Sequence, residues 1–123
     1  MIYEFVYDGP VLTANRLRSM NNRLHVAAVI REIKEHAAVL FWAQHKGVKP
    51  VGSRFIVEIW DECKTASLRD IDAVAPTIKA VYDALQGTLY EDDKQIETVT
   101  LHRPYKSIDK TNRIIFRFEV HDE

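Results

Sequence analysis

The chain has 123 residues and a mass of 14.3 kDa, which is enough for one compact domain over residues 1–123 and too little for two. It is 46% hydrophobic and 28% charged with only four Gly and four Pro, which excludes disordered, collagen-like and low-complexity chains. The net charge of -1 does not indicate a globally basic nucleic-acid binder, and the single cysteine, Cys63, excludes an internal disulfide and a multi-cysteine zinc site.

The first predicted element is an apolar strand over residues 2–7, which the turn residues 8–10 end. The polar, Asn-rich segment 13–23 is predicted as a loop. Apolar residues then recur with helical spacing and predict a long helix over 24–44, which Gly47 ends. No apolar run approaches the roughly 20 residues of a membrane span, and acidic residues stand near the start where a signal peptide is basic. We therefore expect a cytoplasmic protein without a membrane partner.

An alternating pattern over residues 53–61 predicts the next strand. Its residues Phe55, Val57 and Ile59 share one side of this strand. Large apolar residues that lie together belong either to the core or to an interface with a second copy. Two groups are therefore candidates for the core or for a dimer surface: these three strand residues, and the helical pair Phe41 and Trp42.

A second helix is predicted after the polar segment 61–71, with Pro76 in its first turn and Gly87 at its end. Strands over 95–101 and 113–120 follow, and their short connection predicts an antiparallel hairpin. The order β-α-β-α-β-β therefore predicts an α+β domain, in which two main helices pack on a small mixed or antiparallel sheet.

Charge is distributed unevenly along this chain. Residues 11–34 and residues 101–117 each carry five basic residues and one acidic residue, whereas residues 58–97 carry ten acidic and four basic residues. If the outer segments come together in the fold, they flank an acidic centre. The alternative is an uneven distribution that has no functional meaning.

The acidic centre contains an Asp-x-Asp pair, Asp70 and Asp72. Two carboxylates on one side of an extended segment repel each other, so both remain ionised only beside a cation. Magnesium is commonly bound through one or two carboxylates together with water and substrate phosphate, and this spacing fits that chemistry. Lys79 and Asp83 lie four residues apart on one helical face, and the chain then returns with Asp93 as a third carboxylate. Each feature alone also fits a turn, a cap or a surface ion pair.

These residues together resemble the core motif of the RusA-like Holliday junction resolvases, a family of crossover junction endodeoxyribonucleases. Members carry Arg-Asp-x-Asp-Asn, then a helix with Lys-x-x-x-Asp-(Ala/Gly)-Leu, and then Asp-Asp-x-Gln-(Ile/Val) at the start of a strand. The corresponding segments here are RDID at 69–72, KAVYDAL at 79–85 and DDKQI at 92–96. A first strand, a polar Asn/Arg-rich loop and a long helix extend the looser resemblance over nearly the whole chain.

The resemblance implies a small homodimeric endonuclease, often carried by phages, that cuts four-way DNA junctions in recombination or repair. It implies that Asp70, Asp72 and Asp93 are catalytic aspartates that bind Mg²⁺, with Mn²⁺ as a substitute. Lys79 corresponds to the motif lysine near the scissile phosphate, and Asp92 is a second acid beside Asp93. Candidates for phosphate contacts come mainly from the basic segments: Arg16, Arg18, Arg23, Arg69, Arg103, Lys106, Lys110 and Arg113.

The sequence departs from the family in two respects, which leave alternatives open. The family's Asn after Asp-x-Asp is Ala73 here, so a side chain capable of hydrogen bonding is lost. The net charge is also less basic than phosphate binding favours. The alternatives are an endonuclease for flaps or other branched DNA, a non-catalytic module that binds branched DNA, and a metal-binding structural protein with no affinity for nucleic acid.

Overall fold

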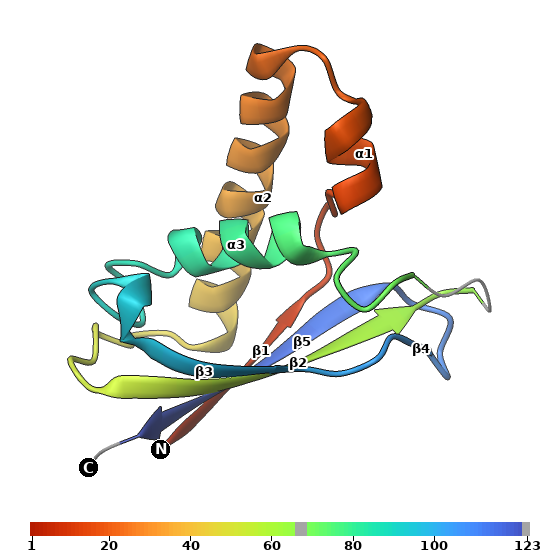
Figure 1. The fold of residues 1–123 in the computed structure, drawn as a ribbon. Coiled ribbons are helices and arrows are strands. Elements are labelled where there is room, and N and C mark those ends of the chain that lie inside the picture. Colours follow the sequence, from red (N-terminus) through yellow and green to blue (C-terminus); the bar gives the residue numbers. More distant parts are fainter. Residues whose placement is uncertain (66–68, 122–123) are drawn as a thin grey trace.

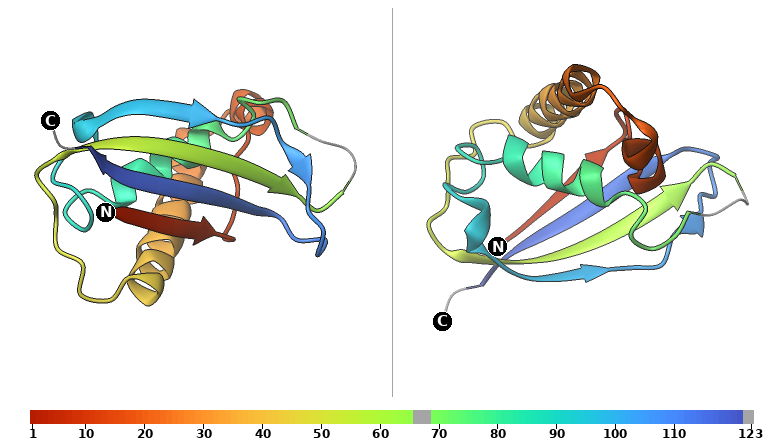
Figure 2. Two further views of the ribbon diagram at one scale, coloured as in Figure 1. Left: turned by 90° about the horizontal axis from the view of Figure 1, so that it is seen from below. Right: turned by 45° about the horizontal axis from the view of Figure 1, so that its top comes forward.

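The computed structural model describes residues 1–65 and 69–121, which form a five-stranded mixed sheet with three α-helices on one face (Figure 1). Both views in Figure 2 place the helices on the same side of the sheet. The predicted α+β class is therefore confirmed. In chain order the elements are β1 (Ile2–Tyr7), α1 (Ala14–Ser19), α2 (Arg23–Gln44), β2 (Arg54–Cys63), α3 (Ala75–Ala84), the 3₁₀ helix η1 (Asp93–Gln95), β3 (Ile96–Leu101), β4 (Tyr105–Lys106) and β5 (Arg113–His121).

The strand order of the sheet is β1-β5-β2-β3, and the short β4 pairs with the end of β2. β5 runs antiparallel to both β1 and β2, whereas β3 and β4 run parallel to β2. The predicted hairpin between the last two long strands is therefore wrong, because β2 lies between β3 and β5. The physical reason is the crossover through α3, which brings β3 alongside β2 in parallel and leaves the other edge of β2 to β5.

The two main helices lie where the apolar spacing predicts them, and their ends have identifiable signals. The side chain of Asn22 accepts hydrogen bonds from the first backbone N–H groups of α2, at 2.9 Å from Leu24 N. Pro76 lies in the first turn of α3, and Gly87, with a φ of +81°, follows its end. Within the described part of the chain, no helix combines the length and apolarity needed to cross a bilayer.

Helix α1 was not predicted, since segment 13–23 was expected to be a loop. The helix buries none of its residues, so it leaves no apolar periodicity in the sequence. It begins because Thr13 caps it: the Thr13 side chain accepts from Arg16 N at 3.2 Å. Its backbone is also tied to a distant part of the chain, because Ala14 N donates to Ala73 O at 2.8 Å.

The core lies between the sheet and the helices. Phe55, Val57 and Ile59 of β2 are fully buried there, as the alternation predicts. Phe41 of α2 is also fully buried, whereas the neighbouring Trp42 is 60% exposed. These three strand residues and Phe41 are therefore core residues, and of the residues proposed for a dimer surface Trp42 is the one that remains accessible.

β2 is longer than its alternating pattern. The strand was expected to end at residue 61, but it continues to Cys63 because its far end pairs with β5 on one side and β4 on the other. Asp61 and Glu62 are consequently buried, with exposed fractions of 0% and 8%. Two carboxylates in such an environment require positively charged or hydrogen-bonding partners.

A buried threonine joins the N-terminal segment to α3. Thr77 Oγ1 accepts from Leu12 N at 2.8 Å and donates to Leu12 O at 2.9 Å. We expect Thr77→Val to lower the free energy of unfolding by about 2 kcal/mol, because two buried backbone groups lose their partner. Chemical denaturation measures this loss. Thr98→Val, on the exposed face of β3, is the matched control, and an equal loss there would contradict this role of Thr77.

Candidate functional site

The Asp-x-Asp pair lies in a turn immediately before α3. Ala73 N donates to Asp70 O at 3.0 Å, and Ala75 N donates to Asp72 O at 3.1 Å. Both aspartates are exposed, and neither caps α3, because the N-cap position is Val74. The turn is held against α1 by the Ala14–Ala73 backbone bond, which uses the carbonyl of Ala73 and needs no side chain at that position.

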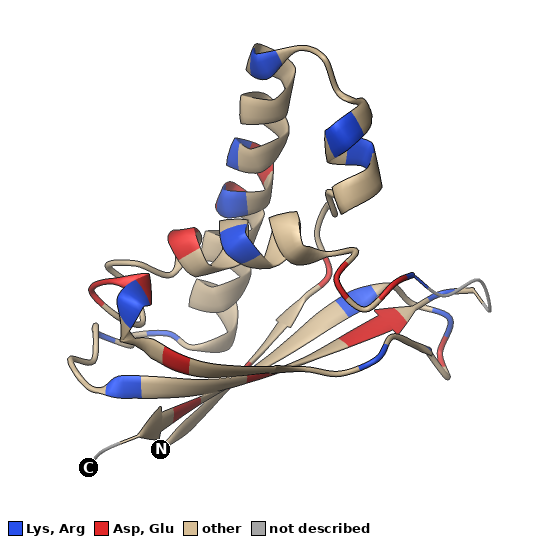
Figure 3. Cartoon of the chain, viewed as in Figure 1, with Lys and Arg blue, Asp and Glu red and all other residues tan. Residues whose placement is uncertain are grey.

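Asp70 lies between two hollows of the surface. One hollow, of about 140 Å³, is lined by Asp70 and Asp72 together with Asn15, Arg18 and the alanines that tie α1 to the turn. The other, of about 460 Å³, is lined by Asp70, Arg69 and Arg103 together with Ile71 and Pro104. The acidic turn therefore has arginine side chains on both sides. Figure 3 shows this red turn below α1, whose upper part carries blue segments.

Lys79 connects α3 to the loop that follows it. Its Nζ lies 2.6 Å from Asp93 Oδ2 and 2.9 Å from Asp83 Oδ1. The spacing of four residues predicts the contact with Asp83, and the return of the chain adds Asp93. The hydrogen bond from Lys79 lowers the pKa of Asp93, and the bonds to Asp93 and Asp83 raise the pKa of Lys79.

Asp92, expected as a second acid, has a structural role in the fold. It is the N-cap of η1, and its side chain accepts from Lys94 N at 2.9 Å. Gln95 completes the capping box, because its Oε1 accepts from Asp92 N at 3.1 Å. This box fixes the backbone from which the Asp93 side chain extends toward Lys79.

The three aspartates proposed as metal ligands are only partly brought together. Asp70 and Asp72 line one hollow, whereas the carboxylate of Asp93 is bound by Lys79. Among residues 1–65 and 69–121, no group of three or more His, Cys, Asp or Glu side chains is placed to hold a metal ion. Magnesium itself needs one or two protein carboxylates, since water and substrate phosphate supply the remaining oxygens. The exposed oxygens of Asp70 and Asp72 fit that requirement.

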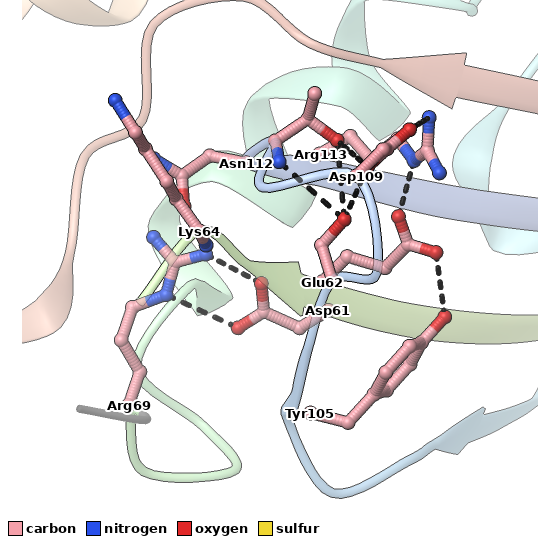
Figure 4. A network of polar contacts seen from close by, with 10 residues as sticks. Asp61, Glu62, Lys64, Arg69, Tyr105, Asp109, Asn112 and Arg113 are labelled. Carbon is pink, nitrogen blue, oxygen red and sulfur yellow. Dashed lines mark hydrogen bonds and ion pairs between the residues drawn. The ribbon is translucent and has the colours of Figure 1, made fainter. Parts of the chain in front are cut away.

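Two of the proposed DNA-contacting arginines instead bind the buried acids of β2 (Figure 4). Arg69 donates to both oxygens of Asp61, from Nη2 at 2.5 Å and from Nε at 3.2 Å. Arg113 is hydrogen-bonded to Glu62, and Tyr105 donates to the same carboxylate at 2.8 Å. Burial and this bond raise the pKa of Tyr105 to about 12.

The sequence analysis missed this buried network. A signal was present, because Asp61 ends the predicted alternating strand on the same side as Phe55, Val57 and Ile59, and Glu62 follows it directly. The other proposed DNA-contacting side chains are exposed. They lie on α1 (Arg16, Arg18), at the start of α2 (Arg23), before and in β4 (Arg103, Lys106) and in the turn before β5 (Lys110).

A scan of the chain against models of known protein families gave no match, and neither did a search of curated proteins. The resemblance to RusA-like resolvases therefore rests on the segment between Arg69 and Ile96 and on the order of the elements. The fold and site define a small α+β domain with an acidic turn immediately before α3, and this turn is flanked by arginines.

The ion pair between Lys79 and Asp93 gives a testable titration. Lys79→Met removes the cation that lowers the pKa of Asp93, so we expect this pKa to rise toward its ordinary value near 4. An NMR titration of the Asp93 carboxyl carbon measures the shift. Lys34→Met is the control, because Lys34 lies 3.8 Å from Asp83 and, among the described residues, forms no ion pair or hydrogen bond with Asp93. An unchanged Asp93 titration in Lys79→Met would contradict the pairing.

Proposed function

We propose that this protein is a magnesium-dependent endonuclease that cuts branched DNA, chiefly four-way junctions. The cutting serves recombination, repair or phage DNA processing in the cytoplasm of a bacterial or phage-infected cell. The observation that carries the proposal is that Asp70 and Asp72 line one hollow with Arg18, and that Arg103 lies on the other side of Asp70. Carboxylates flanked by cations suit a metal ion that meets a phosphate backbone.

Phosphodiester hydrolysis requires neutralisation of charge on the phosphate and activation of water. In the proposed mechanism Asp70 and Asp72 hold Mg²⁺ or Mn²⁺, which when bound supplies Lewis-acid polarisation and a lowered pKa for water. Arg18 and Arg103 bind backbone phosphates on either side of the turn and set the register of the DNA. Lys79 has three donor hydrogens, of which Asp93 and Asp83 take two, so one remains to stabilise charge on the phosphate.

A four-way junction has two-fold symmetry, and its resolution needs two opposed nicks. A homodimer with two-fold symmetry carries two identical acidic turns in a matching arrangement. The proposed active form is therefore a dimer. Cutting of a flap or another branched DNA would need the same aspartates in only one protomer. Competition between substrates therefore distinguishes a junction endonuclease from an endonuclease for other branched DNA.

A second candidate function is a non-catalytic module that binds branched DNA. The ion pair between Lys79 and Asp93 favours it, because the third carboxylate of the motif is already neutralised by a side chain. This candidate predicts binding to a four-way junction that is independent of metal and leaves the DNA intact.

The test incubates the purified protein with a labelled four-way junction, a flap and a linear duplex, each with Mg²⁺ and with EDTA. The proposal expects paired, symmetric nicks in the junction that require Mg²⁺. Binding without nicks supports the non-catalytic module. The absence of salt-dependent DNA binding would exclude both candidates, because phosphate contacts lose affinity steeply as salt rises.

A further inference from the structure

Helix α2 has an outer face that the fold does not cover. The buried residues of this 22-residue helix, Ile33, Ala37 and Phe41, all point to the core. On the opposite side Leu24 is 83% exposed and Trp42 is 60% exposed. Ala28 and Ala38 are also exposed on this side, so the face is apolar apart from Arg31 and Glu35 at its middle.

The residues of this outer face follow a regular spacing. From Leu24 to Trp42 they recur at alternate steps of four and three, which is the repeat by which two helices pack along a seam. Eighteen residues of helix make the seam about 27 Å long. We call this set the outer seam: Leu24, Ala28, Arg31, Glu35, Ala38 and Trp42.

We propose that the outer seam binds the outer seam of a second copy of this chain, with the two α2 helices antiparallel. The two-fold axis crosses the seam at its midpoint, level with residue 33 along the helix. It places Leu24 against Trp42 of the second copy and Ala28 against Ala38 of the second copy. The small alanines allow close approach of the helices. The same axis places Arg31 opposite Glu35 of the second copy, and the symmetry makes this ion pair twice.

Charge decides between the two directions in which the helices can pair. A parallel pair brings Arg31 against its own copy and Glu35 against its own copy, and both contacts repel. The antiparallel pair brings opposite charges together at both places. Within the described residues, neither Arg31 nor Glu35 forms an ion pair or a hydrogen bond through its side chain, so both are available to a partner. Glu32 and Lys34 lie on opposite flanks of the seam: Glu32 is exposed, and Lys34 is paired with Asp83 of its own chain.

The surface beside the seam leaves room for the side chains of the second copy. A hollow of about 260 Å³ lies along α2 and is lined by Glu35, His36, Val39 and Leu40. Val39 is 66% exposed at this hollow and extends the apolar part of the face next to Trp42. The inference names the surface of the dimer on which the proposed function rests. It uses no residue of the acidic turn, so loss of nicking and loss of the dimer are separate outcomes.

The test measures the mass of the full chain in solution by sedimentation at several concentrations. We expect a dimer of the 14.3 kDa chain. Arg31→Glu and Glu35→Arg each place like charges across the axis, so we expect each to weaken the dimer at least about 100-fold. A mixture of these two variants restores opposite charges at both contacts, and we therefore expect a heterodimer. Lys49→Glu, an exposed residue beyond α2, is the control for a change of net charge.

Direction is tested by cross-linking with introduced cysteines. A Leu24→Cys chain mixed with a Trp42→Cys chain should form a disulfide between the two variants, and neither variant alone should form one. The native Cys63 is buried, and the wild-type chain serves as the control for it. A monomeric wild type, dimers that persist in both charge variants, a mixture without heterodimer, or disulfides within the single variants would each overturn the inference. Circular dichroism shows whether each variant is folded.

Discussion

Asp72→Asn is expected to abolish the magnesium-dependent nicking of a four-way junction. The substitution keeps the shape of the side chain but removes its charge and one of its two acceptor oxygens. Loss of a residue that merely supports a metal ligand costs roughly 10–100-fold in affinity or activity, so the loss of a direct ligand should exceed 100-fold. Asp72 is exposed in its turn, and its backbone carbonyl holds Ala75 N, so the fold should be retained.

The matched control is Glu91→Gln, which removes the same charge from an exposed residue of the acidic segment outside both hollows. Its rate of nicking should equal that of the wild type. DNA affinity measured in EDTA should not fall in Asp72→Asn, because the variant carries one negative charge fewer. Nicking at the wild-type rate in Asp72→Asn would overturn the assignment of the metal site.

Local patterns account for most of the helices and strands. The helical spacing from Leu24 and the Pro76–Gly87 signals predict α2 and α3, because each signal lies within one element. The strands that pair with β3 and β5 could not be predicted from local patterns. A short connection permits a hairpin, but the pairing of both strands with β2 depends on long-range packing.

The same distinction applies to the candidate site: contacts within one element could be predicted, and contacts between distant segments could not. The contact between Lys79 and Asp83 lies within one helix and follows from the spacing, whereas the contact with Asp93 requires the chain to return past α3. The binding of Arg69 to Asp61 was not predicted, because the strand was expected to end at residue 61, where a polar segment begins. Burial at that position depends on β4 and β5, which come much later in the sequence.

Arg69→Ala is expected to cause the largest loss of stability among the charged residues near the acidic turn. The carboxylate of Asp61 is fully buried, and both its oxygens accept from Arg69. Removing one partner of a buried ion pair leaves an unpaired charge and costs about 3–5 kcal/mol. The Arg69 side chain is 23% exposed, so water enters more readily and we expect about 3 kcal/mol. Thermal and chemical denaturation measure this loss.

Two further variants separate this structural role from a role in DNA binding. Arg103 lines the same hollow, and its side chain has no hydrogen bond or ion pair within residues 1–65 and 69–121. The stability of the Arg103→Ala variant should therefore match that of the wild type. Asp61→Asn combined with Arg69→Ala should lose less stability than the sum of the single changes, because the buried charge is gone. If Arg69 contacted DNA rather than Asp61, Arg69→Ala would leave stability unchanged and weaken junction binding. Because Arg69 directly precedes Asp70, the ion pair with Asp61 attaches the acidic turn to the end of β2 and so fixes where the Asp70 and Asp72 backbone lies.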